Sequence, residues 1–386
     1  MTLRASKPAF NVREKLTELG RRFGLKGSEL AAAETAQDAR DLVSAGRKNI
    51  LINGGMAVAQ RGTSVVADGN GTFYSPDRFG FHRGVLSTTI TGTQQTVTDL
   101  PEHTTSFRVT CSGNASLVAN SDCWIRYIVE DKDFARINWK NGSNKFVTLS
   151  FYAKSNRTGQ FSCSLNSGNF QTAKNINTFT LENANTWKKI TFTYPAPSTF
   201  TEYNNMGARI YWGMGTGTTY YTSNPNLGWM YNNSKIGAVG DTQIYGDDGA
   251  YFEITGVQLE EGKNATEFEH RPYGEELALC QRYYLKTSNA FGTVYESGGN
   301  NGNVGLGICF PVEMRVAATN TITSLPTGTA NNVHNFGVGN NSYVNGGTYA
   351  GTTRGCQIYL TGGTTRTIGT FSVLNVGAEV SFNAEW

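Results

Sequence analysis

The spacing of apolar and polar residues changes near residue 48 of this 386-residue chain. Before that point, apolar side chains recur at the interval of an amphipathic helix. They are Val12, Leu16, Leu19 and Phe23. A second short helix is expected between Ser28, a good N-cap, and Gly46. Two such short helices cannot bury their apolar faces alone, so they need either copies of themselves in an oligomer or the domain that follows.

From Asn49 to about Tyr273 apolar and polar residues alternate with period two, which is typical of β-strands. The alternation is clearest in residues 146–153, 187–194 and 251–259. Turn pairs such as Asp248 with Gly249 separate these segments, as they do in hairpins. The length and pattern predict one jelly-roll β-sandwich, and Trp187 is expected in its core because it lies in an alternating segment.

A third region, a distal β-sandwich-like domain, is predicted at residues 274–386. Its strands are expected at residues 282–286, 304–310, 357–360 and 370–383. Residues 298–303 and 337–351 are rich in Gly, Asn and Ser, so they are expected to be mobile loops, or turns ordered by a neighbouring chain. The fold class is therefore mainly β, with domains at 1–48 (helical), 49–273 and 274–386.

Composition supports short strands and excludes several partners. Hydrophobic residues make up 38% of the chain and charged residues 16%, while 45 glycines favour turns. A net charge of +3 without clustered Lys and Arg argues against nucleic acid as a partner. No apolar run is long enough to span a membrane and no secretory leader is apparent, so we expect folding in a cytoplasm without membrane insertion.

The residues that usually carry chemistry are scattered. Six cysteines lack metal-site or disulfide spacing and are expected to be small buried residues, and the four histidines are isolated. Neighbouring carboxylates such as Glu275 and Glu276 point to opposite faces of a strand, so they do not form a glycosidase pair by themselves. No catalytic residue and no cofactor are predicted, although Asp241, Asp247 and Asp248 could hold a structural calcium ion.

Three sets of residues resemble the tail-fibre and receptor-binding proteins of short-tailed bacteriophages, in particular those of cyanobacteria. The first set is residues 34–43 (ETAQDARDLV). The second is residues 49–56 (NILINGGM), 60–63, 77–79, 254–262 (ITGVQLEEG) and 266–273 (TEFEHRPY). The third is residues 280–284, 310–315 and 378–386. One departure from the pattern is the pair Ala317 and Ala318, which stands where a Pro-Thr pair commonly follows Met-Arg in these proteins.

The resemblance implies a homotrimeric tail fibre on the virion, assembled in the host cytoplasm. Residues 1–48 would attach it to other tail proteins, and the jelly roll would resemble carbohydrate-binding modules. Adhesion to a host surface polysaccharide without catalysis is the expected function. A structural head or tail decoration fibre without its own receptor is the alternative. A glycan depolymerase fits less well, because such phage spikes resemble long parallel β-helices and this chain has no regular repeat.

Sugars are bound by aromatic faces next to amide and carboxylate side chains. The chain supplies this mixture between residues 203 and 251, where the candidate glycan-binding residues are Trp212, Tyr220, Tyr221, Trp229 and Tyr231. The alternative for Trp212 and Trp229 is that both pack inside the sandwich. The Gly- and Asn-rich loops after residue 295 are a rival receptor-binding surface.

Overall fold

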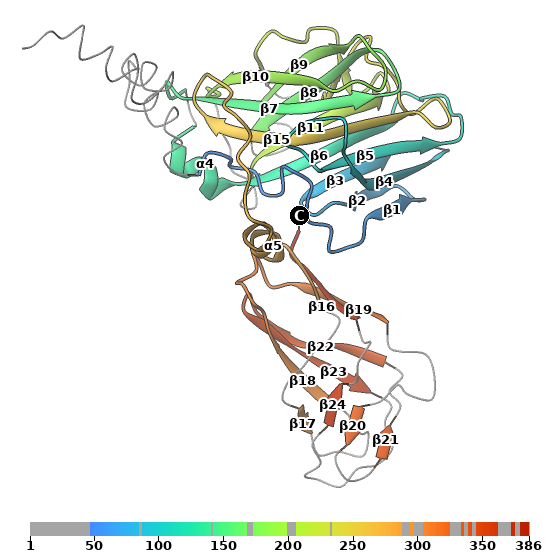
Figure 1. Ribbon diagram of the computed structural model, residues 1–386, viewed down its shortest axis with the longest axis vertical. Coiled ribbons are helices and arrows are strands. Elements are labelled where there is room, and N and C mark those ends of the chain that lie inside the picture. Colours follow the sequence, from blue (N-terminus) through green and yellow to red (C-terminus); the bar gives the residue numbers. More distant parts are fainter. Residues whose placement is uncertain are drawn as a thin grey trace, which may run out of the picture.

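The computed structural model describes residues 47–84, 87–139, 142–167, 173–198, 206–231, 234–287, 294–296, 304–324, 333–335, 339–341, 345–361, 372–374 and 379–385. The two helices predicted before residue 47 and the loop predicted at residues 298–303 lie outside these ranges. The described chain is mainly β, as predicted. It forms a large sandwich and a smaller distal body with a short helix, α5 (Tyr273–Gln281), between them (Figure 1).

Two antiparallel sheets make up the sandwich. The six-stranded sheet contains, in spatial order, β1 (Ser64–Ala67), β4 (Thr89–Thr96), β5 (Thr105–Ser112), β15 (Tyr251–Glu261), β7 (Phe146–Ser155) and β10 (Lys188–Pro195). The seven-stranded sheet contains β13 (Trp229–Tyr231), β9 (Ala173–Leu181), β8 (Gly159–Ser167), β11 (Met206–Thr216), β6 (Asp122–Glu130), β3 (Phe79–Gly84) and β2 (Gly71–Tyr74). The last strand, β15, lies between β5 and β7, an arrangement typical of a jelly roll.

Three short elements complete the sandwich. Helix α4 (Asp131–Ile137) follows β6 and packs against β6 and β11. The strands β12 (Tyr221–Thr222) and β14 (Gly237–Ala238) pair in parallel, and β14 lies against β8, β9 and β11. The segment that carries β12 to β14 therefore covers part of the outer face of the seven-stranded sheet.

The sandwich core forms because alternate residues of facing strands are apolar. In β8, for example, Phe161, Cys163 and Leu165 belong to the core cluster. Aromatic rings fill much of this space. The rings of Phe151 and Trp212 meet edge to face with centroids 5.7 Å apart, as is typical of packed aromatic pairs.

The strands predicted at residues 146–153, 187–194 and 251–259 are confirmed as β7, β10 and β15. The expectation that Trp187 is a core residue is wrong. It precedes β10 and lies half-buried on the outer face, because Ile190 and Tyr194 occupy the inward-facing positions of that strand. Its indole Nε1 donates to Asp99 Oδ1 at 2.9 Å, and Lys154 Nζ lies 4.3 Å from its ring centroid.

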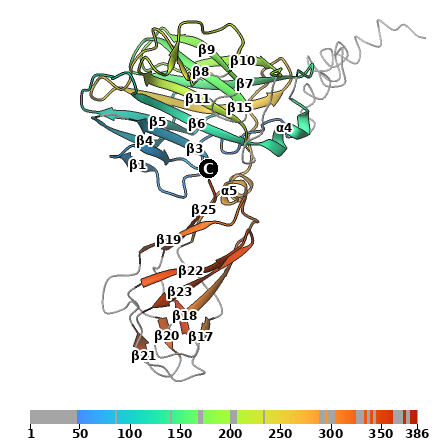
Figure 2. The ribbon, with the colours of Figure 1, turned by 180° about the vertical axis from the view of Figure 1, so that it is seen from behind.

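The distal body consists of three small antiparallel sheets (Figures 1 and 2). The first contains β16 (Tyr284–Thr287), β25 (Glu379–Asn383) and β19 (Thr319–Ser324). The second contains β17 (Val294–Glu296), β18 (Val304–Cys309), β23 (Gly355–Thr361) and β22 (Asn345–Gly351). The third contains β21 (Gly339–Asn341), β20 (Val333–Asn335) and β24 (Ser372–Leu374). A small core of Leu285, Ile308, Met314, Phe382 and Ala384 lies next to the sandwich.

Several distal predictions need correction. Residues 337–351 were expected to be loops or turns, but they contain β21 and β22, and β22 pairs with β23. The strand expected at residues 370–383 is described as two strands, β24 and β25, in different sheets. Cys309 is exposed, whereas Cys111, Cys123, Cys163 and Cys280 are buried as expected. Pairing by β22 gives the Gly- and Asn-rich segment its backbone hydrogen bonds.

A buried arginine joins the two bodies. Arg78, at the start of β3, is 2% exposed and forms an ion pair with Glu385, near the end of the chain. Its guanidinium also donates to the carbonyl of Ile128 at 2.7 Å. The guanidinium carbon lies 3.4 Å from the ring centroid of Tyr283 and 5.0 Å from that of Tyr127. Groups from both bodies thus surround one positive charge.

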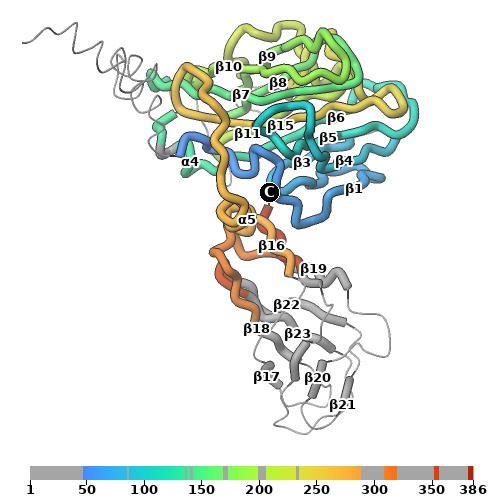
Figure 3. Tube along the Cα trace, in the orientation of Figure 1, coloured from blue at the N-terminus to red at the C-terminus, as the bar shows by residue number. Residues whose placement is uncertain are grey.

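Further contacts surround Arg78. Glu130, at the end of β6, accepts hydrogen bonds from Arg282 at 3.1 Å and from the Tyr283 hydroxyl at 2.5 Å. On the other side, the guanidinium carbon of Arg61 lies 3.7 Å from the ring centroid of Tyr284. The chain passes from β15 through α5 directly into this joint, which therefore fixes the distal body against the sandwich (Figure 3).

We predict that Arg78→Met lowers the free energy of unfolding by about 3–5 kcal/mol, because it leaves the buried Glu385 carboxylate with only the more distant Arg61, at 3.9 Å, as a counter-charge. The side chain of Glu385 is only 3% exposed. Chemical unfolding followed by tryptophan fluorescence measures the change. The control is Lys145→Met, which removes a more exposed ion pair with Glu261 and should cost less than about 1 kcal/mol. Equal losses in the two variants would contradict the role of Arg78.

Candidate functional site

Trp212 is a core residue and is not available to a ligand. It has no exposed surface and lies between the rings of Phe79 and Phe151, with centroids 6.2 Å and 5.7 Å away. The inward-facing positions of β11 include Ile210 and Met214, and Trp212 shares their face. Of the two alternatives for this residue, packing inside the sandwich is the one that the structure shows.

The other four aromatic candidates occupy two places. Trp229 and Tyr231 lie on the edge strand β13, where Trp229 donates to the Pro195 carbonyl at 2.9 Å and packs beside Trp139. Tyr231 is 39% exposed. Tyr220 instead packs over the outer face of the seven-stranded sheet with Trp124 and Tyr211, and Tyr221 begins β12. The five predicted residues therefore do not form one surface.

A pocket of about 160 Å³ lies where the chain enters and leaves the sandwich. Its lining residues are Asn53, Gly55, Ala57, Glu102, His103, Thr104, Thr105, Phe268, His270, Arg271, Tyr273 and Glu276. Most come from the two ends of the sandwich, residues 53–57 and 268–276, and the remainder from residues 102–105. None of them was a predicted site residue, although half lie within segments that carry the resemblance to phage proteins.

Aromatic rings form one side of the pocket. His103 is buried, with its ring centroid 5.2 Å from that of Phe268 and 5.7 Å from that of His270. Tyr273, at the start of α5, is 59% exposed and stands at the rim. The pocket thus offers apolar ring faces that are partly open to solvent.

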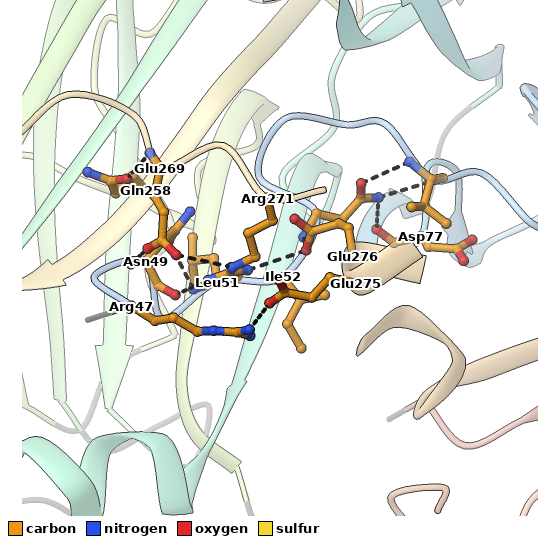
Figure 4. A network of polar contacts seen from close by, with 12 residues as sticks. Arg47, Asn49, Leu51, Ile52, Asp77, Gln258, Glu269, Arg271, Glu275 and Glu276 are labelled. Atoms are coloured by element: carbon orange, nitrogen blue, oxygen red, sulfur yellow. Dashed lines mark hydrogen bonds and ion pairs between the residues drawn. The ribbon is translucent and has the colours of Figure 1, made fainter. Parts of the chain in front are cut away.

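Polar groups on the other side are held in place by a network (Figure 4). Arg271 donates to the carbonyls of Asn49 and Leu51 and lies 3.3 Å from Glu276 Oε1. The same carboxylate oxygen accepts the backbone N–H of Asn53 at 2.6 Å. Each group therefore has a fixed position before any ligand binds.

The same network closes the sandwich at its two ends. Glu269 accepts the backbone N–H groups of Lys48 and Asn49 at 2.7 Å and 2.6 Å, and Arg47 pairs with Glu275 (Figure 4). The Asn49 amide donates to the Val257 carbonyl at 3.0 Å. The segment that enters the sandwich is thus held against the segment that leaves it.

Two glycines of the sequence motifs make room for the pocket. Gly256 has a φ of 59°, and a Cβ there would lie 2.6 Å from the ring of His103. A Cβ on Gly54 would lie 2.0 Å from the carbonyl oxygen of Val257. Neither position can hold a larger residue without displacing the pocket wall.

Burial also sets the charge of the pocket. Together with smaller contributions from the neighbouring His270 and Lys189, it lowers the pKa of His103 to about 4. His103 is therefore neutral near pH 7 and can both donate and accept a hydrogen bond.

The carboxylates that were considered for catalysis or calcium have other partners. Asp241 accepts from Ser162 Oγ at 2.5 Å, Asp247 pairs with Arg157, and Asp248 accepts from the Gly113 N–H. Glu260 accepts from the Thr266 hydroxyl at 2.7 Å. Among the residues that the structure describes, no group of three or more His, Cys, Asp or Glu is placed to hold a metal ion. In the same residues, no helix is long and apolar enough to cross a membrane.

Comparison with known proteins gives low similarity. Neither a protein-family model nor a curated protein matches the chain. Among solved structures, a tailspike protein of Bacteriophage CBA120 aligns at 10% identity and a TM-score of 0.28, over 55% of this chain but only 21% of the tailspike. A xylan-binding domain from Paenibacillus barcinonensis aligns at 11% identity and a TM-score of 0.28, over 57% of this chain and 100% of the domain.

A family 11 carbohydrate-binding module from a cellulase of Clostridium thermocellum aligns at 12% identity and a TM-score of 0.26, over 52% of this chain and 100% of the module. Similarity at this level does not indicate a shared activity, so the function has to be inferred from the residues themselves.

We predict that His103→Gln reduces the loss of stability in acid. Between pH 6.5 and about 4 the unfolded chain binds a proton that native His103 does not, so the free energy of unfolding falls as the pH is lowered. The variant lacks this contribution. From pH 7 to pH 4 the wild type should therefore lose more stability than the variant does. Urea unfolding midpoints of the two proteins measure this difference. A constant difference would contradict the assigned protonation state.

Proposed function

We propose that this chain is a tail-fibre protein of a bacteriophage virion that adheres to a host surface glycan and does not cleave it. The observation that carries the proposal is the pocket beside α5, where ring faces meet fixed polar groups. Phe268, His103 and Tyr273 supply the rings, and Asn53 and Arg271 are among the polar residues. Carbohydrate sites combine these two kinds of surface, because a sugar ring has apolar faces and a rim of hydroxyls.

The size of the pocket favours one sugar residue. Its volume of about 160 Å³ is below the roughly 300–1,000 Å³ of most ligand pockets. A terminal or side-branch residue of a polysaccharide suits this space better than an extended chain. Exposed Tyr273 at the rim is then the residue that covers the outer face of the bound sugar.

The contacts of the carboxylates support binding without cleavage. Glycosidases need two carboxyl groups across the scissile bond, one of which acts as an acid and the other as a base or nucleophile. In the pocket, Glu276 already accepts the Asn53 N–H and pairs with Arg271. Glu102 is exposed at the rim. This arrangement holds Glu276 as a charged structural group.

The fibre role follows from the motifs and from the way the chain is joined. Residues 1–48 attach the protein to other tail proteins, and three copies assemble into a homotrimer on the virion. The joint at Arg78 keeps sandwich and distal body in one orientation. A shallow pocket binds weakly, but three copies on one fibre raise the effective concentration of sites at the cell surface.

We predict that Tyr273→Ala weakens binding to host polysaccharide about tenfold, because it removes one ring face from the bound sugar. Biolayer interferometry of the full-length protein on immobilised polysaccharide measures the effect. Tyr231→Ala is the matched control, since it removes an exposed tyrosine outside the pocket. If Tyr231→Ala abolishes binding and Tyr273→Ala does not, the glycan surface lies at β13 and the pocket is not the site.

A reducing-end assay tests the absence of catalysis. Incubation of the protein with host polysaccharide should release no new reducing ends above the level of a heat-denatured sample. Glu276→Gln and Glu102→Gln identify the source of any activity. Ends that appear with the wild type and disappear with either variant would show that the pocket is catalytic.

A further inference from the structure

Polar side chains are buried on the outer face of the seven-stranded sheet, well away from the pocket. Lys174 on β9, Asn166 on β8 and Arg209 on β11 are direct cross-strand neighbours, because Asn166 pairs with both Lys174 and Arg209. Ser164, two residues from Asn166, lies on the same face. Such neighbours have Cβ atoms about 4.5–5.5 Å apart. These four residues are called the polar row.

The polar row contains hydrogen-bonding atoms without protein partners. Asn166 and Ser164 have no exposed surface. In the part of the chain that the structure describes, the Ser164 hydroxyl, both amide atoms of Asn166 and Nε of Arg209 have no hydrogen-bond partner. Buried polar groups are normally paired, because the loss of water without a new partner is unfavourable. Four such atoms on adjacent strands indicate a site for a bound group.

The charges around the polar row are positive. Arg209 is 9% exposed, and its Nη2 contacts only the sulfur of Met206 at 3.3 Å among the described residues. Burial, followed by the charges of Arg209 and Lys235, lowers the pKa of Lys174 to about 7. Three basic groups, two on the sheet and one on the covering segment, therefore lie near one another.

Two carboxylates on the same face are engaged elsewhere. Glu130, at the end of β6, accepts from Arg282 and Tyr283 in the joint. Asp241 accepts from Ser162 Oγ at 2.5 Å and from the Ala238 N–H at 2.8 Å. Neither carboxylate is paired with Arg209.

We propose that the polar row is a binding site for an oxyanion, either a phosphate group or the carboxylate of an acidic sugar. Arg209 Nε, Asn166 Nδ2 and Ser164 Oγ are donors, and an oxyanion offers only acceptors, so each donor gains a partner. The Asn166 Oδ1 atom then accepts a hydroxyl carried by the same ligand. This site is separate from the pocket beside α5 and does not depend on what that pocket binds.

Described parts of the covering segment lie near the row. The charge of Lys235, between β13 and β14, influences Lys174, and β14 lies against β8 and β9.

Thermal unfolding of the full-length protein at fixed pH and ionic strength tests the proposal. Inorganic phosphate, sodium glucuronate and glucose are titrated separately. An anion that binds only the native protein should raise the unfolding midpoint by about 3–6 °C at a concentration 100-fold above its Kd. Glucose, which has the hydroxyls but no charge, should give no rise. A rise with only one of the two anions would identify whether the site takes a phosphate group or a sugar carboxylate.

Arg209→Met provides the decisive comparison. Without added anion it should be at least as stable as the wild type, because it removes a buried charge that has no carboxylate partner. In this variant, the rise of the unfolding midpoint with phosphate or glucuronate should disappear. Arg157→Met, which removes a more exposed arginine of the same sandwich, should keep the rise. If Arg209→Met does not fold, Asn166→Leu is the second variant. Its unfolding midpoint should not rise with phosphate or glucuronate.

Several results would overturn the proposal. The midpoint could remain unchanged with both anions, or it could rise equally with glucose or in the Arg209→Met protein. Any of these outcomes would mean that the polar row is satisfied by water and holds no anion. Isothermal titration calorimetry of the wild type with the more effective anion should give one site for each chain.

Discussion

The buried charge of Arg78 is the constraint on which the two-body structure depends. A guanidinium taken out of water needs a counter-charge and hydrogen-bond acceptors. Here the acceptors come from β6 of the sandwich and from Glu385, at the far end of the sequence. The ring of Tyr283, which follows α5, covers one face of the guanidinium. Neither body supplies this environment alone, so the sandwich and the distal body have to pack together for the charge to be buried.

The pocket beside α5 results from the same kind of closure. Arg271 and Glu276 hold the first residues of the sandwich against its last segment. Because Gly256 has no Cβ, the ring of His103 fits against the bulge of β15, where the register with β7 shifts after Thr255. The pocket is lined by the residues that make this closure. Its shape is therefore as rigid as the ends of the sandwich, which suits a site that has to hold a weakly bound sugar.

The sequence predicts what local alternation can reveal. β7 and β15 were found because their inward and outward positions differ in polarity. Trp187 was placed wrongly in the core because it lies just outside a strand. Trp212 was left between two alternatives because it lies in β11, which is buried along its whole length. Helix α5 was missed because its apolar residues, 277–280, are consecutive and show no helical spacing. The pocket was missed because it joins segments about 220 residues apart, and only pairing in three dimensions brings them together.

A strand that is buried on both faces also changes how its polar residues are interpreted. On an open sheet Asn166 and Arg209 would be ordinary solvent-facing residues, but the covering segment removes that solvent. Two of the buried arginines in the described part of the chain are thus in opposite circumstances. Arg78 has a carboxylate, a carbonyl and two rings around it, whereas Arg209 lies beside a lysine and an unpaired amide. The first charge is paired with a carboxylate inside the protein and serves the fold. The second gains its missing acceptors only from a bound group, and this difference separates a structural charge from a binding one.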